Sequence, residues 1–591
     1  MDRPIDAQPP VLPPIDILFD ATTTTLASTN TRPSDCPNCP EVVDSPDAST
    51  SASDSICSIS LEKMVQDRSN IFADEPVHVP CRVRKQLSDQ GFDVDSYGVV
   101  RWRPEARTHP RQWPLKRKAY VSALICFLEF FMTMVSNTGS SVSMYAMPQL
   151  GVGNELAVFC FVTVYLLGQA LGGSIFPPIA EAFGGRMIYV STTFGFALAC
   201  FVTAVSGSLW SIVAGRFFAG FFAAVPCVVA AGSIENMWDV RARIFLIHGW
   251  IASAVLGLAS GPAIGTYIST SRLGWAWVYG LASIITAIAS LLCFGMHESR
   301  PSLVLQQSVR SISKKTSFDS LSTASEESLP TLAVFARTSL WQPLRLFLTE
   351  PIVFLVSIMG ATVYAVIYMF SEALSLVYVS GEHSYGWSAQ QGSLVFFAIG
   401  IGAVFSLLPR FYDIKVANKR RSQNAHIEPE DKLFGFYVAA PVLAAGLWWF
   451  ACSIPPLING VSAWVSIASL LLIGYGVVEF DNVLSGYLTD TYASFAASAN
   501  APMSFLRAIL SGVFPLFGRQ FFMKFGSNNA VFVLAAIATA FCGVAGLFRI
   551  YGRQIRRHSS FAEKTWLSAQ TCGHGLVTGL DVEAAAGHGP W

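Results

Sequence analysis

The sequence is poor in charged residues and carries no net charge. Only 13% of its 591 residues are Asp, Glu, Lys or Arg, whereas a soluble domain contains about 25%. The 39 acidic residues balance the 39 basic residues. Because the basic residues form no extended positive face, a nucleic-acid partner is not expected. Many of the charges lie in residues 1–118 and in the C-terminal tail, so the middle of the chain is poorer still in charge.

Motifs of several enzyme and pump classes are missing. No Walker A sequence occurs, so the phosphate cradle of an ATP-driven pump is absent. The nine histidines have no ligand spacing in the apolar segments. We therefore expect no enzyme activity, no metal and no cofactor, with a proton gradient as the energy source of any transport. Cys36 and Cys39 have CxxC spacing, but no second pair follows, which leaves metal or redox use as an alternative to a plain Ser/Thr/Pro-rich loop.

The beginning of the chain lacks the features of a secretory signal. Residues 1–29 contain acids and prolines where a basic region and an apolar core would be needed. We therefore expect the first apolar segment to act as an uncleaved signal anchor. Residues 1–75 have the Ser, Thr, Pro and Asp content of a disordered tail. Residues 76–118 are basic and place Trp113 beside a cationic cluster at the expected membrane interface.

What the chain does have is long apolar segments, in two blocks of six. About 20 such residues span the hydrocarbon core of a bilayer, and the pattern predicts an all-α membrane protein with twelve transmembrane helices in two six-helix bundles. That outline is typical of secondary transporters. The predicted parts are a disordered cytoplasmic tail (1–118), a first bundle (119–296), a cytoplasmic loop (297–350), a second bundle (351–551) and a cytoplasmic tail (552–591). The predicted spans are 119–140, 155–176, 187–206, 209–232, 244–268, 274–296, 351–378, 391–409, 434–453, 461–486, 497–522 and 528–550.

Lys and Arg residues predict the orientation of these spans. They gather in the loops after spans 2, 4, 6 and 8 and next to the membrane at both termini. The loops after spans 1, 3, 7 and 9 contain none, while Arg272, Arg519 and Lys524 are the exceptions. By the positive-inside rule both termini are cytoplasmic. The Ser-rich stretch 317–328 of the central loop is either a solvated linker or a phosphorylation site.

Three loop and helix motifs carry a resemblance to a known family. The stretch Pro177–Arg186 follows span 2, the stretch Glu235–Arg243 follows span 4, and span 5 contains Gly257–Gly265. Together they resemble the major facilitator superfamily, and more narrowly its fungal twelve-span drug:proton antiporters. The resemblance covers residues 109–556. It departs at Pro177, where the family has Gly, and at Gly185, where the family has a base.

The resemblance implies a conformational gate on the cytoplasmic side. An acid at the end of span 2 and bases at the end of span 4 can pair in one conformation and separate in the other, which biases a two-state equilibrium. Ordinary topology charges are the alternative reading for Arg241 and Arg243. Asp490 and the Phe505–Arg507 segment match the family at the end of span 10 and in span 11. The candidate gate residues are Glu181, Gly184, Arg186, Glu235, Asp239, Arg241, Arg243 and Asp490.

Spans 4 and 5 contain two further family features. Arg216 lies inside span 4, where a cation is costly unless it faces a wet cavity or an acid, so it is a functional candidate. Its position matches the membrane arginine that the family associates with proton coupling. The glycines of span 5 recur every four residues beside a proline, which predicts close packing of antiporter helices, with generic helix packing as the alternative. These packing residues are Gly257, Gly261, Pro262 and Gly265.

Buried acids are the candidates for carrying a proton. Glu129 lies about ten residues into span 1, close to the midplane at 1.5 Å per residue. Glu479 in span 10 and Arg507 in span 11 are predicted at similar depth, so they could form a pair that leaves the acid a poor proton carrier. Glu479 and Asp481 are two residues apart and cannot both face one cavity from a regular helix. The full set of proton-coupling and substrate-cavity candidates is Glu129, Arg216, Glu372, Glu479, Asp481 and Arg507.

These observations predict a proton-driven exporter of an organic small molecule such as a drug, a toxin or a secondary metabolite. An uptake or exchange carrier for polyamines or carboxylates is the alternative, and a substrate-sensing transceptor is a third class. The 43 phenylalanines could line a cavity for flat substrates or face lipid. The expected partners are the substrate, protons and the lipid bilayer. The protein is expected to act as a monomer in the plasma membrane, or in the vacuolar membrane.

Overall fold

The structure is a computed structural model. It describes residues 79–559 except 96, 104–105, 317, 319–320, 324–336, 338–340, 382–383, 423–428, 459, 493–495 and 558. The Cys36–Cys39 pair, the turn near Ala493 and the Ser-rich stretch 317–328, except residues 318 and 321–323, lie outside these residues. Predictions about them, and about the tails at 1–78 and 560–591, are therefore untested.

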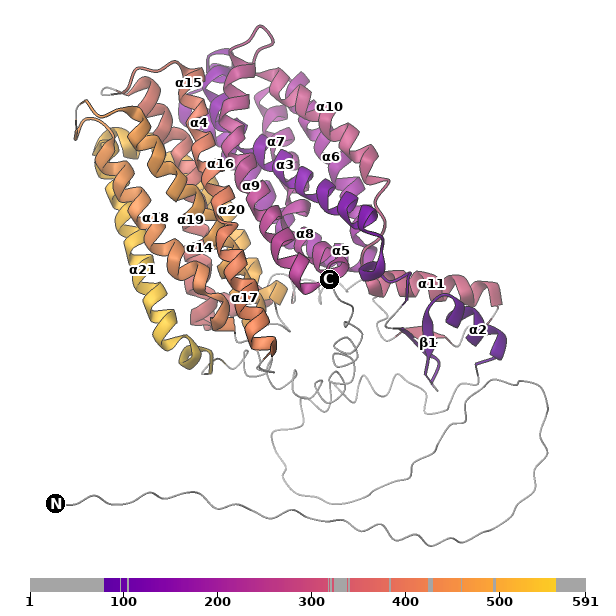
Figure 1. Cartoon of the computed structure of the whole chain (residues 1–591). Helices are drawn as coiled ribbons and strands as arrows, with labels where there is room; N and C mark the ends of the chain where they lie inside the picture. The colour runs from indigo at the N-terminus through magenta and orange to yellow at the C-terminus, as the bar shows by residue number, and fades with distance from the viewer. Residues whose placement is uncertain are drawn as a thin grey trace, which may run out of the picture. The chain divides into compact units, whose positions relative to one another are not determined.

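Twelve helices of the described part are long and apolar enough to cross a membrane. This confirms the predicted fold class, and Figure 1 shows the helices running side by side. The spans cover Leu115–Leu150, Asn154–Glu181, Gly185–Val205, Leu209–Met237, Arg241–Ser269, Ala276–Cys293, Pro351–Ser380, Ala389–Arg420, Phe434–Ser453, Ala463–Thr491, Ser498–Phe525 and Ser527–Arg556.

Several helices extend beyond the predicted apolar stretches, whereas Phe434–Ser453 has the predicted bounds and Ala276–Cys293 is shorter than the predicted 274–296. Once a helix is nucleated, each added residue gains a hydrogen bond, so it continues past the hydrocarbon until a glycine or proline ends it. The first helix, for example, runs to Leu150 and ends at Gly151, which has a φ of 66°. The first-half elements are α3 (Leu115–Leu150), α4 (Asn154–Val158), the π-helix η2 (Phe159–Thr163), α5 (Val164–Phe183), α6 (Gly185–Val205), α7 (Leu209–Val228), α8 (Ala230–Met237), α9 (Val240–Ser269) and α10 (Ala276–Cys293).

The second half is built in the same way from α13 to α21. The eighth span is broken around Val395 and Ser406 into three short helices. The elements are α13 (Gln342–Thr349), α14 (Pro351–Ser375), the π-helix η4 (Leu376–Ser380), α15 (Ala389–Leu394), α16 (Phe396–Phe405), α17 (Leu408–Ser422), η5 (Pro429–Lys432), α18 (Phe434–Ser453), α19 (Ala463–Thr491), α20 (Ala496–Phe525) and α21 (Ser527–Arg557).

The glycine stripe of span 5 packs directly against span 1. A Cβ atom on Gly257 would lie 2.3 Å from the carbonyl oxygen of Phe130, and one on Gly261 would lie 2.7 Å from the carbonyl oxygen of Met134. Both distances are far below van der Waals contact. The absent side chains therefore allow the backbones of α3 and α9 to approach closely, as small residues do in membrane helix pairs.

A small folded unit lies outside the membrane-length helices, and it corrects two predictions. It contains α2 (Cys81–Asp89), β1 (Phe92–Val94), β2 (Val99–Trp102), η1 (Pro110–Gln112), α11 (Pro301–Thr316) and β3 (Ser322–Thr323). We call α2, β1, β2, α11 and β3 the accessory unit; the labels of α2, β1 and α11 lie together in Figure 1. The prediction of disorder over 1–118 is wrong from residue 79 onward, and the loop 297–350 contains helices α11 and α13.

The accessory unit has a core of its own. Strand β1 pairs antiparallel with β2, and β2 pairs parallel with β3 from the central loop. The buried side chains come from both parts of the chain, and the Trp102 indole donates a hydrogen bond to the Pro301 carbonyl at 3.3 Å. Few apolar residues occur in either segment, so neither could bury a core alone. The core residues are Val79, Val83, Leu87, Phe92, Val100, Leu305, Val309 and Ile312.

Candidate functional site

A cavity lies between the two halves of the membrane part. Its wall combines α3, α5 and α7 of the first half with α14 and α20 of the second half. A site at the junction of the repeats is where secondary transporters bind their substrates. The lining residues are Glu129, Thr133, Leu166, Gln169, Ala170, Gly173, Ser174, Ala224, Cys227, Val228, Tyr364, Tyr368, Ala501, Ser504, Phe505, Arg507, Ala508 and Ser511.

Glu129 is the one acidic residue of this lining. It is only 2% exposed, and no Lys or Arg among the described residues forms an ion pair with it. The Trp250 indole lies near Glu129, but its N–H group donates to the Pro226 carbonyl at 3.1 Å. A buried carboxylate without a counter-charge is costly in its ionised form. Binding a proton or a cation removes this cost, so it is favourable for such a group.

Arg507 is the one basic residue of the lining, and it is neutralised. Its Nη1 atom lies 3.1 Å from both carboxylate oxygens of Asp481. Its Nη2 atom lies 3.0 Å from the Sγ atom of Cys227 on the first half, and the guanidinium stands 4.8 Å from the centre of the Tyr364 ring. The Arg507–Asp481 pair is therefore a neutral, oriented group that joins the two halves.

The predicted pair of Glu479 and Arg507 does not form. Glu479 instead forms an ion pair with Arg410, at the start of α17. The physical reason is the helical repeat: residues two apart point to nearly opposite sides of a helix. Asp481 therefore faces α20 and Arg507, while Glu479 faces α17. Arg410 lies in a segment that we predicted as a topology loop, so its role was missed.

Arg216 is fully buried, at 0% exposure, but it lines no part of the cavity, which corrects its place in the predicted cavity set. Its Nε atom donates to the Phe161 carbonyl at 2.8 Å, and Nη1 and Nη2 donate to the carbonyls of Val135 and Ser136 at 3.4 and 3.3 Å. The guanidinium also stands 4.4 Å from the centre of the Tyr165 ring. Backbone carbonyls and aromatic rings thus take the place of the acid or the water that we expected.

The residues that line the cavity also bear on the predictions for Glu372 and for the phenylalanines. Glu372 is 3% exposed but does not line the cavity; its Cγ atom lies against Gly518 of α20. Phe505 is the one phenylalanine in the lining, whereas Phe127, Phe194 and Phe218 are exposed on helix surfaces. These three side chains therefore do not line the cavity, and their contact with lipid stays a prediction.

The candidate gate residues form contacts near the ends of the helices where α3 begins and α6 starts. Arg243 forms an ion pair with Glu235, and Lys432 pairs with Asp490 at 2.6 Å. Glu181 and Asp239 are exposed. Among the described residues no ion pair joins Glu181 to Arg241 or Arg243, so the acid and the bases are apart in this conformation. Arg241 donates instead to Asn418 of the second half at 3.2 Å.

Sequence reasoning missed Glu298 at this gate. Its carboxylate accepts hydrogen bonds from the backbone N–H groups of Gly185 and Arg186 at 3.3 and 3.1 Å. These groups begin α6, where the helix dipole favours a negative charge. Gly184 has a φ of 93°, and a Cβ there would lie 2.4 Å from the Glu298 carboxylate. Glu298 thus binds the loop after span 2, at the position where Gly185 supplies no base.

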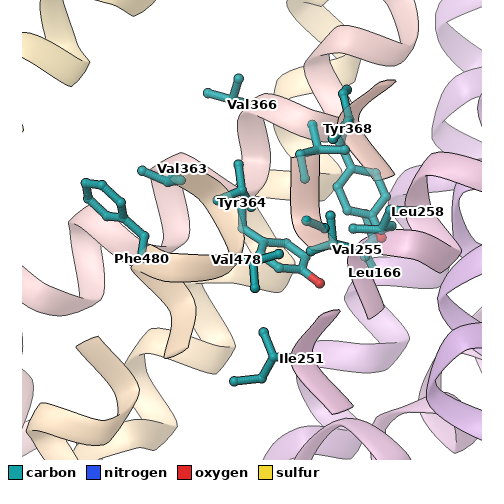
Figure 2. Packing of buried hydrophobic residues seen from close by; sticks show 14 of the residues in the cluster. Leu166, Ile251, Val255, Leu258, Val363, Tyr364, Val366, Tyr368, Val478 and Phe480 are labelled. Carbon is teal, nitrogen blue, oxygen red and sulfur yellow. The ribbon is translucent and has the colours of Figure 1, made fainter. Parts of the chain in front are cut away.

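The two halves also contact each other on the side of the cavity that is opposite the gate residues. Ser136 and Tyr368 share a hydrogen bond of 2.9 Å, and the Thr163 hydroxyl donates to the Gly512 carbonyl at 2.7 Å. Figure 2 shows Tyr364 and Tyr368 of α14 pointing toward Val255 and Leu258 of α9. Further along, Glu155 contacts Gln520. These contacts close the junction on the side that we predict to be external.

No metal site is found in the part of the chain that the structure describes. No group of three or more His, Cys, Asp or Glu side chains is placed to hold an ion there.

Comparison with known proteins decides the family. The sequence profile of the Major Facilitator Superfamily matches residues 129–515. The chain belongs to the Major Facilitator Superfamily. It is 28% identical to the MFS-type transporter paaT of Penicillium rubens, over 79% of this chain and 84% of the relative. It is 28% identical to the multidrug transporter TPO1_1 of Candida glabrata (78% and 80%). It is 31% identical to the efflux pump FUB11 of Gibberella moniliformis, over 70% of this chain and 69% of the relative.

A solved structure agrees on the fold. A POT family transporter crystallised with 5-aminolevulinic acid superposes with a TM-score of 0.50 at 14% identity, over 76% of this chain and 99% of that one. The predicted family resemblance is therefore confirmed. This superfamily member is a multi-pass membrane transporter of small molecules and not an enzyme, as predicted.

Proposed function

We propose that this superfamily member is a proton-coupled exporter of an organic small molecule, working by alternating access in a fungal plasma membrane with both termini in the cytoplasm. The observation that carries the proposal is the contrast between the two charged residues of the cavity lining: Glu129 forms no ion pair among the described residues, whereas Arg507 is paired with Asp481, which lies outside the lining. Glu129 would exchange a proton for substrate as the cavity changes sides.

The cavity charges favour a neutral or singly positive substrate. A polyamine needs several free carboxylates, but Glu129 is the one acid in the lining. An anionic metabolite needs a free cation, but Arg507 is engaged by Asp481, and Arg216 is sealed among carbonyls. Tyr364, Tyr368 and Phe505 add aromatic surface for a flat or amphiphilic molecule. The polyamine and carboxylate alternatives therefore receive no support.

The names of the relatives agree with export. One is called a multidrug transporter and another an efflux pump. The inter-half contacts through Ser136 and Thr163 suit a state whose cavity is closed to the outside. In that state the substrate would enter from the cytoplasm.

The test is transport in proteoliposomes with an imposed pH gradient. Purified wild type, Glu129→Gln and Glu372→Gln would be compared for gradient-driven flux of candidate drugs and metabolites. We expect Glu129→Gln to lose roughly tenfold or more of the coupled flux, a coupling energy of ordinary size, and Glu372→Gln, a buried acid outside the cavity, to lose far less. Equal flux in wild type and Glu129→Gln would refute the proposal.

A further inference from the structure

A second buried cluster of ionisable groups lies away from the central cavity. It contains Arg410 and Asp413 of α17 and Glu479 of α19, which are joined by ion pairs, and His248 of α9, which is a neighbour of the Arg410 charge. None of these four residues lines the cavity. Their side chains are almost completely enclosed: Arg410 is 7% exposed, Asp413 12% and Glu479 0%.

The cluster has one cation for two carboxylates. The Nη1 atom of Arg410 lies 2.9 Å from Asp413 Oδ2, and Nη2 contacts Glu479 Oε1. Lys432 is a further charged neighbour of Asp413, but it forms its ion pair with Asp490, at 2.6 Å. With both carboxylates ionised, the buried group would carry one excess negative charge, which is costly in a medium of low polarity.

The hydrogen bonds of the two carboxylates point to the same excess of negative charge. Each carboxylate uses one oxygen on Arg410, and the second oxygens, Asp413 Oδ1 and Glu479 Oε2, are buried without a partner. Such orphaned atoms in a native fold call for a missing proton, water or ion. The described residues place no metal-binding group here. A proton is the smallest ligand that removes the excess charge.

His248 connects this cluster to the first half. The Ser406 hydroxyl donates its hydrogen to the Ala403 carbonyl at 2.6 Å, so its oxygen accepts from the Nε2–H group of His248 at 3.2 Å. That tautomer leaves Nδ1 as a bare acceptor, and Nδ1 is buried without a partner. The charged neighbour of His248 is Arg410, which opposes a second positive charge. The proton therefore belongs on the carboxylates rather than on the imidazole.

We propose that Asp413 and Glu479, bridged by Arg410, share one bound proton and form a second proton site at the junction of α9, α17 and α19. Tyr475 is the other ionisable neighbour of Glu479, and it lies on the same helix. This site goes beyond the proposed function, which places the transported proton on Glu129. The two sites are on different helices, so they are separable by mutation.

The test is infrared spectroscopy of the purified full-length protein at neutral pH, without substrate. The readout is the carbonyl band of protonated carboxylic acids, identified by its shift in deuterated water. Either Glu479→Gln or Asp413→Asn leaves Arg410 with a single carboxylate, so each variant alone should remove the share of the band that belongs to this site. Asp481→Asn, which alters the one-to-one pair with Arg507, should leave that share intact.

The infrared spectra of the variants distinguish the proton at this cluster from a proton on Glu129 in the cavity. The band owed to Glu129 is lost only in Glu129→Gln, whatever happens at the cluster. If both cluster variants keep the full wild-type band, while their thermal midpoints show that they are folded, the cluster holds no proton and the inference is wrong. A variant that does not fold would be replaced by its partner variant, because either one removes the shared proton.

Discussion

The Asn137 side chain completes a hydrogen bond that Pro262 leaves open. The carbonyl of Leu258 would normally accept from the N–H group four residues later, but proline has none. Asn137 Nδ2 of α3 donates to this carbonyl at 2.7 Å instead. The carbonyl that Pro262 leaves open therefore ties α9 to α3, beside the glycine stripe.

This relationship predicts a coupled pair of mutations. Asn137→Ala should destabilise the protein by about 1–3 kcal/mol, because it leaves the buried Leu258 carbonyl unpaired. In a Pro262→Ala background the helix supplies its own N–H group, so the same Asn137→Ala change should cost much less. Unfolding midpoints of the four proteins of this double-mutant cycle measure the coupling. Additive effects would mean that the two residues do not share this carbonyl.

The packing of α9 on α3 predicts a contrast between two glycines of one helix. Gly257→Ala would push a methyl group into the Phe130 carbonyl, and overpacking of this kind costs about 1–3 kcal/mol. Gly249→Ala is the matched control, since nothing lies within 4 Å of its added Cβ. Thermal stability in detergent should fall for the first variant but not for the second, where alanine favours the helix more than glycine does. Equal stability of both variants would contradict the close approach of the helices.

The accessory unit predicts that two distant segments unfold together. Val309→Asp places a charge in the core shared by α2, β1, β2 and α11. Amide hydrogen exchange should then rise in residues 81–102 as well as in 301–316, because neither segment can bury its apolar side chains alone. Gln307→Asp, on the exposed face of α11, serves as the control. A rise confined to 301–316 would show that the two segments fold independently.

The membrane part was predictable to a far greater extent than the accessory unit. Spans are recognised from local composition, since any stretch of about 20 apolar residues must cross the bilayer or be buried. The accessory unit depends on a parallel pairing between Val100 and Thr323, which no local pattern encodes. Its Ser- and Arg-rich segments have the composition of disordered chain until the second segment supplies the remaining core.

The site was predictable in its residues but not in its pairings. The acids and arginines inside the spans were identified because a buried charge is rare and therefore informative. Their partners depend on how helices far apart in the sequence rotate against each other. Depth alone suggested Glu479 for Arg507, whereas the helical phase of α19 selects Asp481. Arg410 was missed because it lies where a buried helix end resembles a basic loop.

The start of the first span predicts a pH-sensitive contact. His109 Nδ1 accepts a hydrogen bond from the Arg111 N–H group at 3.1 Å, so the bond needs an unprotonated ring. Burial, with Arg111 and Lys118 nearby, lowers the pKa of His109 below its ordinary value. The folded state therefore favours the neutral ring, and this stabilisation is present above about pH 6.5 and is lost as the pH falls below it.

Hydrogen exchange over residues 106–113, corrected for intrinsic rates, should therefore rise as the pH falls below the ordinary histidine pKa. The variant His109→Asn keeps an acceptor that does not titrate, so its corrected exchange should not change over the same range. If wild type and His109→Asn respond equally to pH, another group is responsible.

The variant Arg216→Lys keeps the positive charge of this residue but removes its planar guanidinium group, so it tests which of the two the structure needs. The planar group of Arg216 reaches the carbonyls of Phe161, Val135 and Ser136 at once, and lysine cannot reproduce that fork. Arg216→Lys should therefore lower the thermal midpoint, by an amount corresponding to one or two unpaired carbonyls at about 1–3 kcal/mol each. The pH dependence of transport in the folded fraction should stay that of wild type, because the residue lines no part of the cavity. A stable Arg216→Lys protein with altered pH dependence would instead return Arg216 to the proton pathway.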